Sequence, residues 1–552
     1  MTPTAYRATI AMALVSSAAA RTEGQEHQHP PSQPTTVQAG AVTPLYENLG
    51  NLEHPITTSS PTAQQYFNQG LRLVYGFNHD EAVKSFQEGL KHDSTCAMCY
   101  WGIAYALGPN INLPMDTSAV RPAWEAVQQA LRFRGGVTPK ERAYIEALSR
   151  RYSADPSANR ASLDSAYAEA MRLVSYAYNK GDDEATLYAE ALMDLRPWNY
   201  WTNGGRAKAP STLEQLSVLE RVVRRNPDHP GACHYYIHAI EASNEAGKAL
   251  ACAERLGGLM PGAGHLVHMP THIYIRLGKW DVAADRNVHA VHADEQYIRE
   301  RKPTGVYPMA YYPHNYHMMW YALNMLGRSE DALKAAQGVI KNVPVDVVRQ
   351  APPLEYFSPT VLFTLARFSK WDDILSQGAP PKDLRYTTGI WHYVRGLAYT
   401  GQGKLDAAAG ERDQLVAVAS EVPADAFANL NSVQSLLAIA RTHLEGEMAA
   451  RQGRTQEAVT HLRKAAAGED ELTYDEPPPW YLPIRQRLGV VLLEAGRPVA
   501  AEKAFRQDLV RRPENGWSLH GLAQSLKAQK RNKEAAAVEA RFQKAWSKAD
   551  VM

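Results

Sequence analysis

Histidine has the most informative spacing of any residue type in this 552-residue chain. His234 and His238 are four residues apart, and His268 and His272 repeat that interval. Because residues four apart lie on one face of an α-helix, each pair could direct two imidazoles at one metal ion. Neighbouring side chains continue these faces, so the candidate metal ligands are His234, His238, Glu241, His265, His268, His272, His314 and His317.

These imidazoles outnumber the ligands of one tetrahedral site. They fit a six-coordinate ion, two ions, or one ion with spare histidines for acid–base chemistry. A nitrogen-rich set with one carboxylate fits zinc, copper, iron or manganese. If the protein is an enzyme, the site indicates a metal-dependent hydrolase or oxidoreductase with Glu241 as candidate base. Alternatively, the histidines hydrogen-bond a peptide ligand or one another, in a protein that binds without catalysis.

A 34-residue period relates the two histidine pairs, because the same offset separates Pro227 from Pro261, Ala249 from Ala283, His234 from His268 and His238 from His272. Segments such as HLVHMPTHIYIRLGKWDVAADRNVHAVHAD and YHMMWYALNMLGRSEDALKAAQGVI share an internal pattern, with glycine five residues before alanine. The period and pattern resemble those of tetratricopeptide repeats, each a pair of antiparallel helices. The resemblance implies an all-α superhelical solenoid over most of residues 60–546, interrupted by irregular loops.

In such repeats the first helix of each pair lines a concave groove. Stacking would place His234 beside His268, His238 beside His272, and His317 beside His268. Two residues continue the face of His317, and the segment TYDEPPPWYLP is an acidic, aromatic loop that either closes over the groove or spaces two repeats. The candidate ligand-pocket residues are therefore Tyr321, Asn324, Glu476 and Trp480. A bound molecule would be a small molecule or a peptide, with a protein partner as the alternative.

Phrases such as CAMCYWG, HYYIHAIEAS, PGAGHLVHMPTHIY and YDEPPPWYL are similar to those of a group of exported bacterial tetratricopeptide proteins. That resemblance supports the fold and implies no particular activity. Residues 1–20 predict a signal peptide: one arginine, an apolar run too short to span a bilayer, and an Ala-Ala-Ala end. We therefore expect a secreted or periplasmic protein, with a disordered linker at 21–44 and a solenoid at 45–552 whose histidine-rich repeats cover about 229–340.

Charge and missing motifs exclude several functions. The formal charge is +1, so no basic field favours nucleic acid, and no later stretch is long enough to span a membrane. Nucleotide-binding loops, a hydrolase nucleophile elbow and a haem-attachment motif are absent from the sequence. Cys96 and Cys99 could form a local disulfide or remain buried thiols, and Cys233 is expected to pack between helices.

Overall fold

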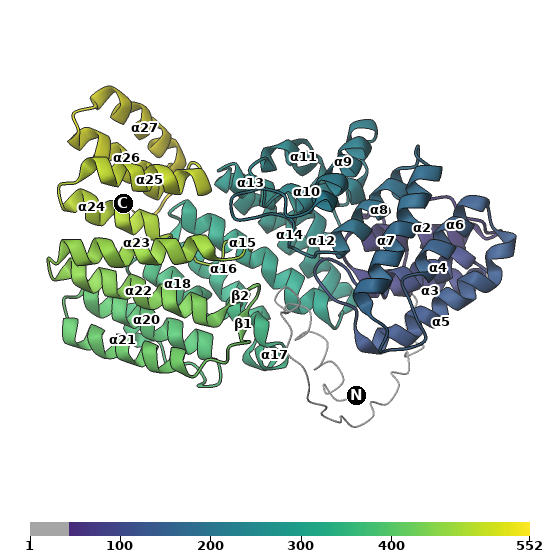
Figure 1. Cartoon of the computed structure of the whole chain (residues 1–552), viewed down its shortest axis with the longest axis horizontal. Coiled ribbons are helices and arrows are strands. Elements are labelled where there is room, and N and C mark those ends of the chain that lie inside the picture. Colours follow the sequence, from purple (N-terminus) through teal and green to yellow (C-terminus); the bar gives the residue numbers. More distant parts are fainter. Residues whose placement is uncertain (1–42, 552) are drawn as a thin grey trace. The chain divides into compact units, whose positions relative to one another are not determined.

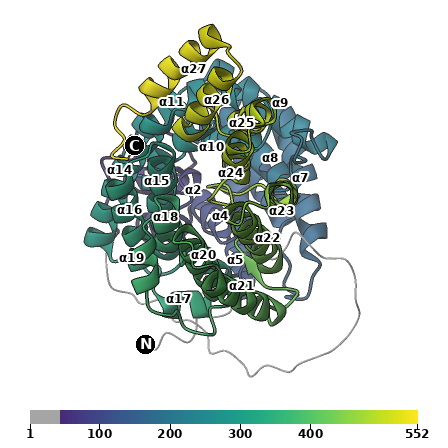
Figure 2. The ribbon, with the colours of Figure 1, turned by 90° about the vertical axis from the view of Figure 1, so that its left-hand side faces the viewer.

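The computed structural model describes residues 43–551, and helices make up most of them (Figure 1, Figure 2). The all-α fold class is thereby confirmed. The predicted signal peptide at residues 1–20 lies outside the described residues, as does nearly all of the predicted linker at 21–44. Among residues 43–551, no helix is both long and apolar enough to cross a membrane.

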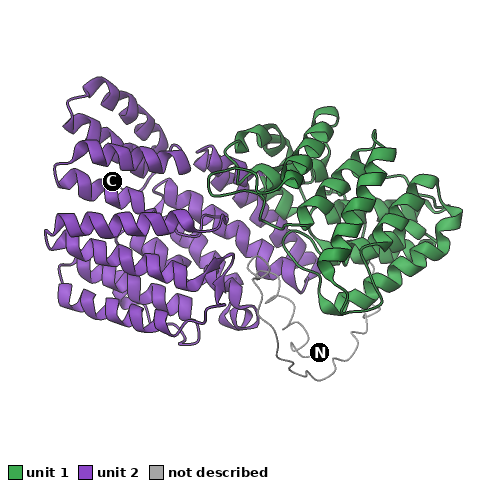
Figure 3. Cartoon of the chain, in the orientation of Figure 1, with its two compact units in different colours: residues 1–269 green, residues 270–552 purple. Residues whose placement is uncertain are grey.

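The chain forms two compact units, residues 1–269 and 270–552, called unit 1 and unit 2 (Figure 3). The division falls beside Pro270, inside the histidine-rich segment. The helices of unit 1 are α2 Pro61–Tyr75, α3 His79–His92, α4 Ala97–Ala106, η2 Thr117–Ala119, α5 Val120–Phe133, η3 Arg134–Gly136, α6 Pro139–Ser149, α7 Arg160–Ala177, α8 Asp182–Asp194, α9 Pro210–Arg225, α10 Pro230–Ile240, η4 Ala246–Ala249, α11 Leu250–Leu259 and α12 Gly264–His268.

Unit 2 is mainly helical. It also contains a short hairpin, in which the two-residue strand β1 Phe427–Ala428 pairs antiparallel with the two-residue strand β2 Asn431–Ser432. Its helices are α13 Pro270–Arg276, α14 Trp280–Arg301, η5 Tyr307–Tyr311, α15 Tyr312–Met325, α16 Ser329–Asn342, α17 Val345–Gln350, η6 Pro352–Phe357, α18 Thr360–Arg367, α19 Trp371–Ser376, α20 Arg385–Gly401, α21 Leu405–Ser420, α22 Val433–Arg451, α23 Thr455–Glu471, α24 Ile484–Glu494, α25 Pro498–Arg511, α26 Gly516–Ala528 and α27 Asn532–Ala545. Consecutive helices pack in pairs, such as α20 with α21 and α22 with α23 (Figure 1).

One turn recurs between the two helices of a pair. A residue with positive φ follows the end of the first helix, and the next residue donates its N–H to the carbonyl five residues earlier, as from Lys279 to Tyr274 and from Asn78 to Leu73. This arrangement is a Schellman motif, which favours glycine at the left-handed position. The left-handed residues are Phe77, Gly278, Gly327, Ser369, Gly403, Gly453, Gly496 and Lys530. The glycine–alanine pattern of the sequence is therefore the signature of this turn.

Glycines also allow neighbouring helices to close on aromatic rings. A Cβ added to Gly70 of α2 or Gly102 of α4 would lie 2.5 Å from the ring of Phe86, which α3 holds between them. In unit 2, Gly489 of α24 and Gly521 of α26 enclose Phe505 of α25 in the same way. Both units thus contain the small-residue helix crossings that the resemblance to tetratricopeptide repeats implies.

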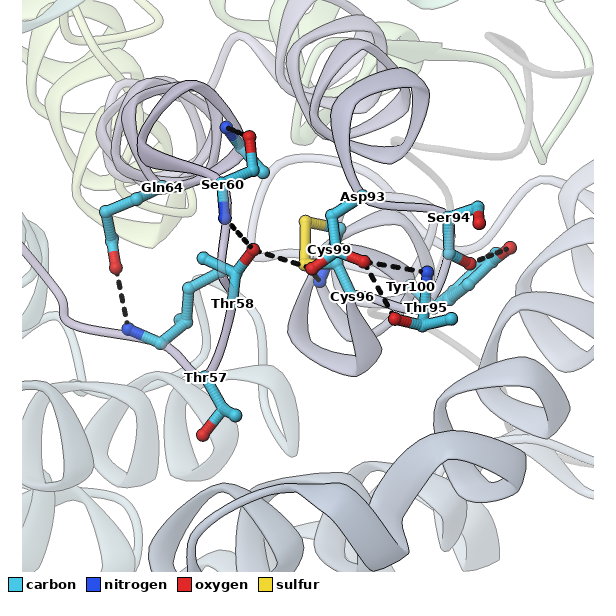
Figure 4. The surroundings of a disulfide bond; sticks show 12 residues. Thr57, Thr58, Ser60, Gln64, Asp93, Ser94, Thr95, Cys96, Cys99 and Tyr100 are labelled. Atoms are coloured by element: carbon cyan, nitrogen blue, oxygen red, sulfur yellow. Dashed lines mark hydrogen bonds between the residues drawn. A yellow bond between two sulfur atoms is a disulfide. The ribbon is translucent and has the colours of Figure 1, made fainter.

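All four cysteines lie in unit 1 and form disulfides. Cys96 bonds to Cys99 at the start of α4, next to Asp93, which accepts hydrogen bonds from Thr58 and Thr95 (Figure 4). Cys233 is buried between helices, as expected, but it is also bonded to Cys252 of α11, a pairing that the sequence did not indicate. The second disulfide joins α10, which carries two candidate metal ligands, to α11.

Candidate metal centre

Helix α10 carries His234 and His238 into the interior of unit 1. The helix begins at Pro230, whose fixed φ suits a first helical position, and the His229 side chain caps it by accepting the Ala232 N–H at 3.1 Å. Helix α10 packs against α2, α8 and α9. As a result both imidazoles are buried, at 0% and 2% relative exposure.

Each α10 histidine has one ring nitrogen held by a neighbour. His234 Nδ1 lies 2.7 Å from the backbone carbonyl oxygen of Tyr75, and His238 Nδ1 lies 3.0 Å from Glu241 Oε1. A carbonyl or carboxylate oxygen accepts hydrogen bonds, so Nδ1 is the protonated nitrogen in both rings. Nε2 then carries the lone pair that can bind a metal. This is the usual outer-shell arrangement of metal-ligating histidines.

His265 of α12 completes a group of three imidazoles. Its Nε2 lies 3.1 Å from His234 Nε2. One potential ligand atom from each of His234, His238 and His265 lies within 4.8 Å of the others. Two nitrogens on one tetrahedral zinc ion are separated by roughly 3.3 Å, as Zn–N bonds of about 2.0–2.1 Å require. The three imidazoles therefore have a spacing that one ion could bridge after small movements.

The cluster favours neutral imidazoles, the form that binds metals. Burial lowers the pKa of His234 to about 3; the hydrogen bond to Tyr75 opposes this shift, and the nearby His268 and His79 add to it. Burial likewise lowers the pKa of His79 to about 4. At neutral pH these rings carry lone pairs rather than charge.

Two aromatic residues with left-handed backbones pack against the cluster. The Phe77 ring centroid lies 4.5 Å from that of His234, 5.4 Å from that of His265 and 5.9 Å from that of His238. Trp198 meets His238 edge-on, with 5.2 Å between centroids. Their φ values are +55° and +59°, which are unfavourable for bulky side chains. Such strain persists where the surroundings enforce it and is concentrated at functional sites.

A largely buried carboxylate connects the two segments that flank the cluster. Asp183 of α8 lies 2.5 Å from Tyr75 Oη, 2.6 Å from His54 Nδ1 and 3.1 Å from His229 Nε2. Burial would raise the Asp183 pKa, but the hydrogen bonds from His229 and His54 hold it well below its usual range. Asp183 thereby ties the end of α2 to the start of α10, the two elements that orient His234.

The remaining predicted ligands of unit 1 take different places. Glu241, predicted as a ligand or base, is fully buried and accepts the hydrogen bond from His238. The 34-residue period predicts His268 as the neighbour of His234, yet the structure gives His234 a direct contact with His265, one helical turn earlier. The His268 ring lies 5.9 Å from that of His265.

In unit 2, His272 lies beside two of the predicted residues. Its Nδ1 contacts the carboxylate of Glu476, which comes from the acidic loop at 473–483. The ring of His314 is 6.0 Å from that of His272. The loop therefore contacts α13 through Glu476 and His272.

Other predicted residues of unit 2 are part of its core. His317 lies among the rings of Trp320, Tyr356, Phe357 and Tyr481, and neither of its ring nitrogens has a hydrogen-bond partner among the described residues. Burial lowers its pKa to about 3.

The three remaining candidates are also buried. Tyr321 Oη accepts a hydrogen bond from Arg512 Nε at 3.0 Å. The backbone carbonyl of Asn324 accepts one from Trp517 Nε1 at 2.9 Å. Trp480 packs against Phe363 and Tyr393.

The sequence analysis did not identify Tyr75, Phe77 or His79 as neighbours of the histidine cluster. It also missed the contact between Trp198 and His238 and the hydrogen bonds that Asp183 accepts. One signal for Phe77 was available: aligning Ala82 with Ala283 places Phe77 where the later repeat has Gly278. A bulky residue at a glycine position indicates a conformation imposed by tertiary contacts. The other contacts join residues about 40 to 160 positions apart, such as Trp198 with His238 and Tyr75 with His234, and no local pattern predicts them.

Three solved structures are similar to this chain at low identity and with TM-scores of 0.33 or lower. Human IFIT1, solved as a dimer with m7Gppp-AAAA, is 12% identical, with a TM-score of 0.33 over 89% of this chain and 91% of that one. Yeast Tom70 is 10% identical, with a TM-score of 0.32 over 87% and 99%. Cut9, from the APC/C hetero-tetramer Cut9–Hcn1, is 12% identical, with a TM-score of 0.31 over 84% and 76%. No protein-family model matches the chain, and no curated protein matches it.

Proposed function

We propose that unit 1 binds one divalent transition-metal ion through His234, His238 and His265. The observation that carries the proposal is the pair of α10 histidines whose Nδ1 atoms are engaged by Tyr75 and Glu241, beside a third imidazole 3.1 Å from His234. Three neutral nitrogen ligands favour zinc, copper or iron over manganese. Glu241 orients His238 in this arrangement and is not itself a ligand.

Three protein ligands leave one coordination position for water or another molecule, as in catalytic zinc sites. A metal-dependent hydrolase or oxidoreductase therefore extends the proposal, with the bound ion acting on a small or extended ligand. The alternative is a scaffold in which the same residues only support the fold and a peptide or protein partner binds elsewhere. Metal bound by the wild-type cluster supports the first function, and its absence supports the scaffold.

The test uses untagged protein that is stripped with chelator and titrated with Zn²⁺ or Co²⁺. We expect His238→Ala with His265→Ala to lose about one equivalent of metal relative to the wild type. Glu241→Gln should keep the site but weaken binding about 10–100-fold, the usual effect of an outer-shell change. Elemental analysis gives the stoichiometry, and calorimetry gives the affinity.

The matched control is His289→Ala with His292→Ala, since both residues are exposed on α14. This variant should bind as the wild type does. If the two double variants bind alike, or if the wild type retains no metal, the cluster is structural and the scaffold function replaces this one.

We also propose that the chain is exported. Support comes from the pattern of residues 1–20 and from the two disulfides, which are typical of oxidising compartments. Protein isolated from its native host should begin near Arg21 by N-terminal sequencing. An intact Met1 would contradict export.

A further inference from the structure

A pocket of about 540 Å³ lies inside unit 2, among α18, α20, α22 and α24. Its volume is within the range of small-molecule sites. Apolar side chains form part of the wall, including Leu397, Leu482 and Val490. The charged lining consists of three arginines and two carboxylates: Arg367, Arg451, Arg487, Glu447 and Glu494.

Arg367, the last residue of α18, is the unusual member of this lining. Its Nε and Nη2 atoms are buried and have no hydrogen-bond partner among the described residues. Its guanidinium carbon lies 4.1 Å from the centroid of the Trp517 ring, so the group is stacked on an indole. Burial lowers the Arg367 pKa to about 9; Asp508 opposes this shift and Arg512 adds to it. A buried guanidinium without an anion is costly, so the group needs a compensating partner such as an ion or ligand in the pocket.

Two nearby carboxylates, those of Glu447 and Asp508, already have partners. Glu447 Oε1 accepts a hydrogen bond from Arg487 Nε at 2.6 Å, and Asp508 accepts one from Arg512 Nη1 at 2.9 Å. Neither carboxylate forms an ion pair with Arg367 within the described residues. The positive charge of Arg367 is therefore left for a molecule that enters the pocket.

Trp517 holds the guanidinium in one orientation. The indole Nε1 donates to the Asn324 carbonyl oxygen, and Trp546 packs edge-on at 4.9 Å. Nε and Nη2 lie on one edge of the planar guanidinium, and this edge matches two oxygens of a carboxylate or phosphate. Gln486, which also lines the pocket, has a buried Oε1 without a partner among the described residues, and this oxygen could accept a ligand hydroxyl or N–H.

We propose that this pocket binds the oxyanion of a small organic molecule, a carboxylate or a phosphate monoester, through the guanidinium group of Arg367. The apolar wall takes the rest of the molecule, and Gln486 selects for a hydrogen-bond donor near the anion. This site uses residues of unit 2 only and is independent of the histidine cluster in unit 1.

The experiment measures binding to the full chain by calorimetry with three probes that share a phenyl group. Phenylacetate carries a carboxylate, phenyl phosphate carries a phosphate monoester, and 2-phenylethanol is neutral. We expect at least one anion to bind the wild type more tightly than the alcohol. Preference for phenylacetate assigns the carboxylate class, and preference for phenyl phosphate assigns the phosphate class.

Variants of Arg367 test its role. Arg367→Met keeps the length and apolar bulk of the side chain and should weaken anion binding at least about tenfold, a loss of about 1.4 kcal/mol. Arg367→Lys keeps the charge but loses the two-pronged edge, so it should also bind more weakly than the wild type. The control is Arg454→Met, because Arg454 is exposed in an ion pair with Glu457 outside the pocket, and it should bind as the wild type does.

Three outcomes would overturn the proposal: equal anion affinity in Arg367→Met and the wild type, alcohol binding as tight as anion binding, or no anion binding at about 10 mM probe. Because Arg367→Met removes a buried charge without a partner, we expect it to fold at least as stably as the wild type in the absence of ligand. Weaker binding in this variant would then report the lost contact.

Discussion

Replacing Arg151 with Met should lower the free energy of unfolding of unit 1 by about 3–5 kcal/mol, the usual loss when one partner of a buried ion pair is removed. Arg151 is fully buried. Its Nη2 contacts the Asp194 carboxylate and donates to the Pro109 carbonyl oxygen at 3.1 Å, while its Nε lies 3.4 Å from Asp164 Oδ1. Methionine fills much of the space but provides no charge.

The size of the loss follows from the carboxyl groups left behind. Glu190 and Asp194 lie four residues apart on α8 and are both buried. Burial and the neighbouring Glu190 raise the pKa of Asp194 well above its usual range, although Arg151 opposes this shift. Burial alone would lower the Arg151 pKa, but Asp194, Glu190 and Asp164 raise it well above its usual range. Without Arg151, the carboxyls must bind further protons or unfold.

Urea denaturation of the full chain measures this loss, with Arg172→Met as the matched control. Arg172 pairs with Glu169 on the surface of α7, so the control should change stability by less than about 1 kcal/mol. Proton uptake by the freed carboxyls makes the Arg151→Met defect smaller at pH 5 than at pH 8. Equal stability of the two variants would contradict the assignment of Arg151 as the essential counter-charge.

The sequence was sufficient to predict the repeat architecture, because each helix pair carries local information. Glycine at Gly278, Gly327 and Gly403 is favoured by the left-handed turn, and the alanine that follows lies at a close helix crossing. These requirements recur with the repeat and are visible without three-dimensional data. The α-helical class follows directly from them.

The candidate site was predicted less completely, since its contacts depend on tertiary structure. His268 and His272 were expected on one continuous helix, but Pro270 cannot donate to the helical ladder and follows the end of α12. In the structure His265 contacts His234. Nothing local to Phe77 indicates that its ring packs against three imidazoles from α10 and α12.

The acidic loop at 473–483 leads to a pH-dependent stability. Asp475 is buried, and burial raises its pKa to about 8 despite hydrogen bonds from the Leu430 backbone, Asn429 and Asn431. The titratable side chains facing it are Tyr356, Tyr386 and Tyr481, whose pKa values are all raised above the usual range, so these phenols stay neutral. Between pH 4 and pH 8, folded Asp475 therefore keeps a proton that the unfolded chain has released.

The sign of the effect follows from proton linkage. A carboxyl whose folded pKa is raised contributes stability that is present below its unfolded pKa and lost as pH rises through the folded value. Asp294 and Glu355, with pKa values of about 7 owing to burial, act in the same direction. His317 has the opposite sign, but only below its unfolded pKa of roughly 6.5. We therefore expect unit 2 to lose stability as pH rises from 6.5 to 9.

Asp475→Asn isolates the contribution of this carboxyl, because asparagine has nearly the same shape and does not titrate. The wild type should lose stability faster than the variant between pH 6.5 and pH 8, by up to about 1.4 kcal/mol per pH unit, and the two should run parallel above pH 8.5 or so. Urea denaturation at a series of pH values gives both slopes. The difference in slope does not depend on how the substitution changes absolute stability. Equal slopes from pH 6.5 to 8 would therefore show that folded Asp475 is ionised and that the loop does not bury it.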